Sequence, residues 1–231
     1  MSEPIPSATV VLLREANETI EVLLLKRNSK IAYGGMWVFP GGKIDATDYE
    51  QSDATVTDGC DRDYGCMLAA AQNAAQRETQ EEAGLDIQRE KLIYFAHWTT
   101  PKVRPKRFST WFFIARAETY DVTIDGGEIH EHCWRSPADA LRAHREGEIE
   151  LVPPTFLTLL EISPYNSIGE VEGAFSNAQP RIFEPKVEVL PEGLCYFYEG
   201  DAGYENSDHQ AEGARHRLYA KTNKEWQYQR S

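Results

Sequence analysis

Three glutamates, Glu78, Glu81 and Glu82, stand close together in a stretch with helical character. On a helix they are three and four positions apart, so their carboxylates crowd one side. Like charges at this spacing destabilise a helix unless a cation neutralises them. Clustered carboxylate oxygens suit Mg²⁺ or Mn²⁺ better than Zn²⁺, which prefers nitrogen and sulfur ligands. The spacing therefore predicts a metal site built from hard oxygen ligands.

The position of Glu82 sharpens this prediction. At about 100° per residue, Glu82 falls between Ala71 and Ala75, within the apolar stripe of the helix. A carboxylate in an apolar stripe is costly unless it is paired or binds a metal. The alternative is a solvated acidic face on which Arg77 pairs with the glutamates. The position of Glu82 and the glycine-rich run at 40–42 favour the metal site.

The elements that must position these glutamates follow from the hydrophobic pattern. Segments 8–14 and 20–26 are rich in Val, Leu and Ile, flank a polar stretch and predict a β-hairpin. A run of alanines ending before Gly84 predicts a helix over 66–83, with the glycine as its C-cap. We predict further strands at 91–98, 108–116, 181–190, 194–199, 215–220 and 225–229, and further helices at 137–146 and 154–162.

Composition limits the partners of the chain. The 37 Asp and Glu residues outnumber the 24 Lys and Arg residues, and the net charge is −13. General nucleic-acid binders carry a basic face and peripheral membrane proteins a basic patch, so we expect neither nucleic acid nor membrane as a partner. No apolar run approaches the ~20 residues of a membrane span, and the first residues do not resemble a signal peptide.

The four cysteines form no CxxC pair. A zinc site or a disulfide at Cys60 and Cys66 is the alternative to reduced thiols, which are typical of the cytosol. We therefore expect a cytoplasmic protein.

The glutamates belong to a longer motif, Arg77-Glu78-Thr79-Gln80-Glu81-Glu82-Ala83-Gly84. Together with Gly42 it resembles the Nudix box, G-x5-E-x7-R-E-U-x-E-E-x-G-U, where U is a bulky apolar residue. Thr79 departs from the first U, and Asp48 stands where the box has its first Glu. The box places Arg 14 positions after Gly, whereas Arg77 follows Gly42 by 77 − 42 = 35 positions, so 21 extra residues lie inside the motif.

The extra residues lie in an acidic stretch with seven acids and one Arg between Asp45 and Asp63. An insertion before the helix is tolerable, because loop closure costs little for each added residue. Counted back from Arg77, the place of the first Glu falls on Ala69, so the role of Asp48 stays open. A split box of this kind resembles a subgroup that includes peroxisomal coenzyme A diphosphatases.

The resemblance implies a fold and a reaction. The fold is a Nudix-like α/β/α sandwich with a mixed sheet over residues 1–164, with the acidic insertion at about 45–66. Residues 165–231 form a β-rich extension packed on the same domain. The reaction is Mg²⁺- or Mn²⁺-dependent attack of water on the diphosphate of a nucleoside diphosphate derivative. Coenzyme A or acyl-coenzyme A is favoured as substrate, followed by ADP-ribose and nucleotide sugars.

The resemblance also assigns roles to the motif. Glu78 and Glu82 are the main metal ligands with Glu81 assisting, and the main-chain carbonyl of Gly41 or Gly42 completes the site. Arg77 orients the glutamate side chains by charge-assisted hydrogen bonds.

The family often supplies one more Glu from a later loop, shortly before a Trp. Glu128, six residues before Trp134, is the candidate, and Glu131 is the alternative. The general base is left open among Glu78, Glu81, Glu82 and Glu128.

A dense basic loop is the other candidate site. It contains four cations within six residues, namely Lys102, Arg104, Lys106 and Arg107. Lys102, Arg104 and above all Arg107 are predicted to receive the terminal phosphates of the substrate. The alternative is a solvated hairpin tip that balances the acid surplus.

Aromatic and histidine residues carry weaker signals. Tyr33, Trp37, Phe39 and Trp98 are candidates to stack on a base, with core packing as the alternative. We expect His97 to be structural. A zinc site at His130 and His132 is only weakly indicated, because no third ligand is nearby.

A second hypothesis is a Nudix-like sensor or scaffold that binds nucleotides without turnover. The stretched box and the long tail motivate it, whereas the retention of all three helix acids favours the enzyme. A third reading, an RNA-processing Nudix enzyme, lacks the basic surface that RNA requires. The expected partner is a small nucleotide-derived substrate, and the tail leaves a homodimer open.

Overall fold

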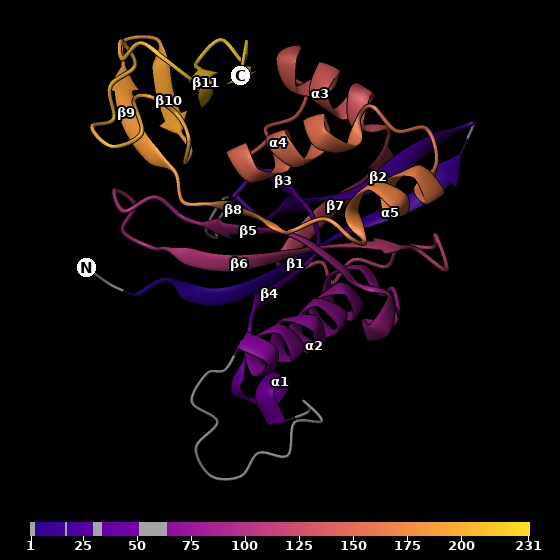
Figure 1. Cartoon of the computed structure of the whole chain (residues 1–231). Helices are drawn as coiled ribbons and strands as arrows, with labels where there is room; N and C mark the ends of the chain where they lie inside the picture. Colours follow the sequence, from indigo (N-terminus) through magenta and orange to yellow (C-terminus); the bar gives the residue numbers. More distant parts are fainter. Residues whose placement is uncertain (1–2, 17, 30–33, 51–63) are drawn as a thin grey trace.

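The structure is a computed structural model that describes residues 3–16, 18–29, 34–50 and 64–231, and it places helices on both faces of a mixed sheet (Figure 1). The main sheet has the strand order β3-β2-β1-β6-β5-β8, with β4 paired to β1 and β7 paired to β2. Its strands are β1 (Ile5–Ala16), β2 (Thr19–Arg27), β3 (Trp37–Val38), β4 (Gly41–Lys43), β5 (Ile93–Thr99), β6 (Phe108–Arg116), β7 (Ile129–Arg135) and β8 (Arg181–Phe183).

Burial on both faces explains why the central strands are apolar without interruption. β1 runs parallel to β6 and antiparallel to β2 and β4. Successive side chains of a strand point to opposite faces, and here both faces meet a core. Val10 and Leu12 pack with the core under helix α2, whereas Val11 and Leu13 belong to the core under the later helices.

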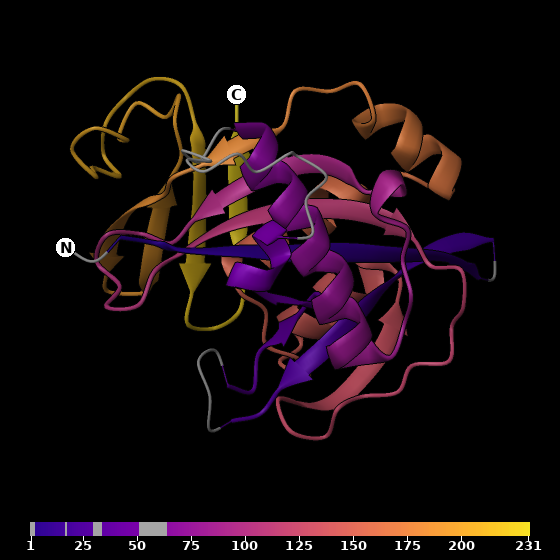
Figure 2. The same ribbon diagram turned by 90° about the horizontal axis from the view of Figure 1, so that it is seen from below.

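Helices cover the two faces unequally, as Figures 1 and 2 show. One face carries α2 (Tyr64–Ala83) together with the short α1 (Ala46–Glu50), and the other carries α3 (Pro137–Arg145), α4 (Pro153–Ile162) and α5 (Ile168–Phe175). The buried alanines of α2 let its backbone lie close to the sheet. The helix ends at Gly84, whose φ of 66° lies in the left-handed region that favours glycine.

The predicted fold class is confirmed, and five of the strands and α-helices were not predicted. These are the strands β3, β4 and β7 and the helices α1 and α5. β7 was not predicted as a strand because its sequence, IHEHCWR, is largely polar and exposed. α5 contains Gly169 and Gly173, which have low helix propensity, so its pattern is weak.

The predicted strand at 181–190 is two strands, which lie in different sheets. β8 extends the main sheet parallel to β5, whereas β9 (Lys186–Leu190) begins a second sheet. That second sheet has the order β12-β11-β10-β9, with β10 (Gly193–Phe197), β11 (His216–Lys221) and β12 (Gln227–Arg230). The tail therefore holds a helix and a main-sheet strand besides its own sheet. A domain division at residue 164 stays a prediction.

A buried ion pair holds the second sheet together. Arg217 and Asp201 are both fully buried, with Nη2 of the arginine 2.6 Å from Oδ1 and Nε 2.8 Å from Oδ2 of the carboxylate. Aromatic rings join the turn before β12 to α3 and α4, since Trp226 packs edge-on against His144 at 4.6 Å and Phe156 at 5.1 Å. Among the helices described, none is both long and apolar enough to cross a membrane.

Candidate active site

The predicted glutamates lie where α2 meets the glycine turn of β4. Oε2 of Glu82 accepts a hydrogen bond from the amide of Gly41 at 2.8 Å. The carboxylate of Glu78 lies so close to Gly42 that a Cβ atom there would be 2.4 Å from it. A side chain at position 42 would therefore displace the Glu78 carboxylate from its place at the turn. The structure brings Glu78, Glu82 and the Gly41–Gly42 turn together.

Burial makes both of these carboxylates unusual. Glu82 is 5% exposed, and burial raises its pKa to about 8 against the opposing effect of the Gly41 amide. Burial also raises the pKa of Glu78, although the Arg77 guanidinium beside it acts in the opposite direction. Removing two carboxylates from water is costly unless a cation compensates them. A cation beside them would offset this cost.

Arg77 connects the side chains around this site by hydrogen bonds. Its Nε and Nη2 atoms donate to the two carboxylate oxygens of Asp48 at 3.1 and 2.9 Å, and Nη2 also donates to the Lys43 carbonyl at 2.9 Å. Its Nη1 atom donates to Glu78 at 2.9 Å and Glu81 at 3.1 Å. The Asp48 hydrogen bond is the main reason that the pKa of Arg77 is raised. Arg77 thus ties α1, β4 and α2 together.

Glu81 differs from the other two glutamates of the motif. Its side chain is 57% exposed, and its carboxylate contacts Nη1 of Arg77. The corresponding values are 15% for Glu78 and 6% for Glu82. Glu81 therefore lies on the rim of the site, while the other two face the glycine turn.

Arg27 is a site residue that the sequence analysis missed. It is the last residue of β2, and its Nη2 atom lies 2.8 Å from Oε2 of Glu128. Its Nη1 atom lies 3.7 Å from Oε1 of Glu82, which is too long for a hydrogen bond. Arg27 thereby brings Glu128 to the buried glutamates. In the sequence, Arg27 stands out only as a cation at the end of an apolar strand. Its contact with Glu128 depends on the pairing of β2 with β7, which was not predicted.

The two later glutamates lie on different sides of β2. Glu128 contacts Arg27, whereas Glu131 contacts Lys26 at 2.6 Å. Neighbouring side chains of a strand point to opposite faces. The Lys26 ammonium also lies 5.8 Å from the ring of Trp37, which belongs to the core opposite α2. The geometry therefore groups Glu128, and not Glu131, with the motif.

The donor set fits one divalent cation of the magnesium type. In the part of the chain that the structure describes, no three or more His, Cys, Asp or Glu side chains are arranged to hold a metal, and the assisting role of Glu81 stays a prediction. The same finding gives the zinc alternative at His130 and His132 no support. Two carboxylates and the main chain of Gly41 or Gly42 remain. This set suits Mg²⁺, which takes one or two protein carboxylates and fills its shell with water and substrate phosphates.

The basic loop lies apart from the carboxylates. Phe108 pairs with Ile5 of β1, whereas Gly41 pairs with Thr9, four residues further along. At ~3.3 Å per residue, the two pairings lie roughly 13 Å apart along β1, and β4 and β6 flank that strand on opposite sides. Lys102, Arg104 and Lys106 are exposed there. Arg107 is half-buried and donates from Nε to the Thr100 carbonyl at 3.0 Å, which closes the hairpin.

The aromatic candidates mostly belong to the core. Trp37, Phe39 and Trp98 are buried, and Trp98 stacks on Phe183 with ring centroids 3.9 Å apart. Tyr33 lies outside the described residues. His97 is bound to Ser109 Oγ at 2.7 Å, which agrees with a structural role.

Part of the sequence is similar to a known domain and to a curated protein. Residues 3–154 match the NUDIX domain. Acyl-coenzyme A diphosphatase NUDT19 from Gallus gallus is 27% identical over 131 residues, which are 52% of this chain and 35% of that protein. The chain thus spans about a third of the length of this curated relative.

Solved structures share the fold. A NUDIX hydrolase from Alicyclobacillus acidocaldarius aligns with a TM-score of 0.64 and 22% identity, over 78% of this chain and all (100%) of that chain. The NUDIX domain of Shewanella oneidensis NrtR, complexed with ADP ribose, aligns with a TM-score of 0.51 and 16% identity, over 71% of this chain and 89% of that one. Since the NUDIX match covers residues 3–154, well over half of the sequence, the chain belongs to the NUDIX family.

Proposed function

We propose that this chain hydrolyses the diphosphate bond of a nucleoside diphosphate derivative with the help of Mg²⁺ or Mn²⁺. Coenzyme A or acyl-coenzyme A is the favoured substrate, followed by ADP-ribose and nucleotide sugars. The observation that carries the proposal is the pair of buried carboxylates, Glu78 and Glu82, held at the Gly41–Gly42 turn. The relative named as an acyl-coenzyme A diphosphatase supports the choice of substrate.

The chemistry divides between the cation and the chain. A bound divalent cation supplies charge that neutralises the phosphate oxygens of the substrate. Glu78 and Glu82 hold that cation, with the main-chain carbonyl of Gly41 or Gly42. Arg77 keeps Glu78 in place through Nη1, so it is a positioning residue.

Activation of the attacking water falls to one of the carboxylates. Glu128 is 61% exposed and anchored by Arg27, so it is open to solvent and yet held near the buried pair. A general base needs hydrogen-bond reach to the water it activates. We assign Glu128 to the catalytic set with Glu78, Glu81 and Glu82. Lys102, Arg104 and Arg107 are proposed to contact phosphates at the far end of a long substrate such as coenzyme A.

A nucleotide sensor without turnover is the second candidate. The contact between Arg27 and Glu82 favours it, because the arginine partly supplies the positive charge that a cation would bring. The two candidates differ in whether both halves of the substrate are released.

The test is a panel of coenzyme A, acetyl-coenzyme A, ADP-ribose and UDP-glucose, incubated with the chain and Mg²⁺. Both products are identified by mass spectrometry. We expect cleavage of the coenzyme A compounds, loss of cleavage in EDTA and a fall of roughly 10²–10³-fold in Glu82→Gln. Glu146→Gln, at the exposed end of α3, is the matched control. Full turnover by Glu82→Gln would refute the site, and saturable binding without products would favour the sensor.

A further inference from the structure

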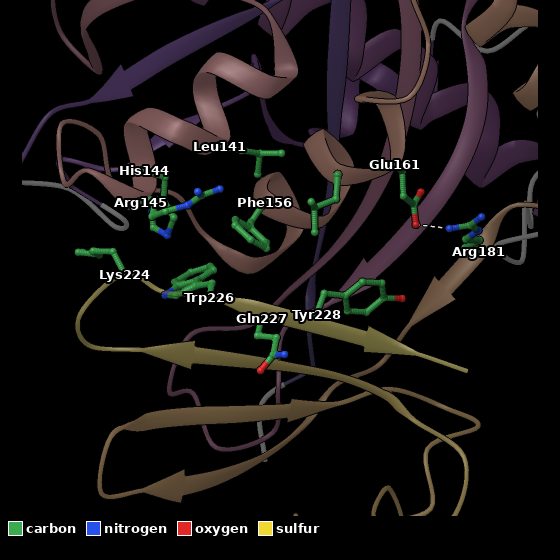
Figure 3. Close-up of a pocket in the computed structure, with 11 residues that line it drawn as sticks. Leu141, His144, Arg145, Phe156, Glu161, Arg181, Lys224, Trp226, Gln227 and Tyr228 are labelled. Carbon is green, nitrogen blue, oxygen red and sulfur yellow. Dashed lines mark hydrogen bonds and ion pairs between the residues drawn. The ribbon is translucent and has the colours of Figure 1, made fainter.

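A separate pocket lies between the helices α3 and α4 and the C-terminal strand β12 (Figure 3). It encloses about 480 Å³, which is within the range of small-ligand sites. None of the residues that line it belongs to the carboxylate site. Most of them follow residue 154, where the NUDIX match ends. The pocket therefore lies where α3 and α4 meet residues of the C-terminal extension.

Aromatic rings form one wall of the pocket. Trp226 meets Phe156 at a centroid distance of 5.1 Å and the ring of His144 at 4.6 Å, in both cases edge-on. The Trp226 indole N–H already donates to the Lys221 carbonyl at 3.1 Å, so the ring is held in place. A fixed aromatic wall suits a flat, partly apolar ligand.

One buried polar atom in the lining lacks a partner, since Nε2 of His144 makes no hydrogen bond within the described part of the chain. The His144 side chain is fully buried, and its Nδ1 atom lies 3.4 Å from both the Ile149 carbonyl and the Leu151 amide. An unpaired buried polar atom costs roughly 1–3 kcal/mol. Nε2 is closed to solvent, so a ligand does not reach this atom unless the lining moves.

Cations gather at the same pocket, although the chain carries a net charge of −13. Arg145, Arg181 and Lys224 all line it. Arg181 pairs with Glu161, and Lys224 lies 2.5 Å from Glu150. Arg145 forms no ion pair with any described residue and is exposed at the pocket edge. Its charge is available to an anion.

We propose that this pocket binds a nucleoside monophosphate. The base lies against Trp226 and Phe156. The phosphate lies at the edge, where Arg145 and Lys224 receive it. The proposal does not depend on hydrolysis at the carboxylate site, because the two sites share no residue.

The test uses the full chain labelled with 5-fluorotryptophan, observed by ¹⁹F NMR in EDTA so that no divalent cation supports binding at the carboxylates. The five tryptophans give separate signals, and Trp226→Phe identifies the signal of Trp226. AMP is titrated, with adenosine and ribose 5-phosphate as its two halves. We expect AMP to shift the Trp226 signal saturably, and each half to bind roughly tenfold more weakly.

Variants separate the pocket from the carboxylate site. Arg145→Ala is expected to weaken AMP binding roughly fivefold. Arg142→Ala, on the same helix but outside the pocket, is the matched control and should leave binding unchanged, as should Glu82→Gln. The proposal is wrong if AMP leaves the Trp226 signal unmoved, if Arg145→Ala and Arg142→Ala bind AMP equally, or if Glu82→Gln abolishes the shift.

Discussion

The Arg77 guanidinium donates two hydrogen bonds to the Asp48 carboxylate, with Nε 3.1 Å from Oδ1 and Nη2 2.9 Å from Oδ2. Asp48 is 2% exposed and lies on α1, at the start of the long acidic stretch inside the motif. The contact joins residues 29 positions apart. It gives Asp48 a role as the partner that sets the direction of Arg77.

The first prediction concerns this pair. Asp48→Asn removes the charge that Arg77 binds, so Arg77 should hold Glu78 less firmly. We expect unfolding free energy to fall by about 1–3 kcal/mol and hydrolysis to fall roughly tenfold. Denaturant titration and a product assay measure the two effects. Glu118→Gln, which breaks an exposed pair with Lys91, should cost less than about 1 kcal/mol. Equal stability of the two variants would contradict the assigned role of Asp48.

The second prediction concerns the close approach of Gly42 to Glu78. In Gly42→Ala the new methyl group would meet the end of a side chain, which can move aside. We therefore expect a fold of nearly unchanged melting temperature, but a displaced Glu78 and a loss of activity of roughly 10²-fold. Gly169→Ala, where a Cβ meets nothing within 4 Å, is the control for both measurements. Undiminished activity in Gly42→Ala would show that Glu78 is not needed at this turn.

The third prediction separates the two late glutamates. Glu128→Gln should lower kcat by roughly 10–10³-fold, because Glu128 lies beside Arg27 and the buried carboxylates. Glu131→Gln should stay near the parent rate, since Glu131 contacts Lys26 on the other side of the strand. Steady-state kinetics on both variants decide the matter. The assignment is lost if Glu131→Gln shows the larger defect.

The fourth prediction is a pH dependence of stability at Asp201. Burial alone would raise the pKa of Asp201, but hydrogen bonds from Arg217 and from the amides of His216 and Gly203 outweigh it, so the pKa is lowered. A lowered pKa means that the charged form stabilises the folded state at pH values above the unfolded pKa of about 3.9. That contribution is lost as the pH falls through the folded pKa.

Asp201→Asn should therefore cost about 3–5 kcal/mol at pH 7, because it leaves Arg217 buried without its counter-charge. The difference from the parent chain should shrink below about pH 4. Denaturant unfolding at pH 7, 4 and 3 measures it, with Glu205→Gln in an exposed pair as the control. A difference that does not change with pH would show that the Asp201 charge is not the source.

The sequence alone predicted the features that depend on near neighbours. The helix over 66–83, its glycine stop and the crowding of Glu78, Glu81 and Glu82 all follow from helical periodicity, which relates residues three and four apart. The buried position of Glu82 also followed, because it lies within the apolar stripe of the same helix. The resemblance to the Nudix box rested on these local features.

Only the tertiary structure decided which of these groups share a site. The Arg27–Glu128 contact joins residues 101 positions apart and depends on the pairing of β2 with β7. The pocket at Trp226 likewise needs the last strand to return to α3 and α4. The spacing of residues along one helix or strand predicts which way their side chains point. Contacts between distant elements depend on strand register and packing, which the spacing within one element does not determine. For that reason the glutamates and Arg77 were found from the sequence, whereas the roles of Asp48 beside Arg77 and of Arg27 beside Glu128 were found from the fold.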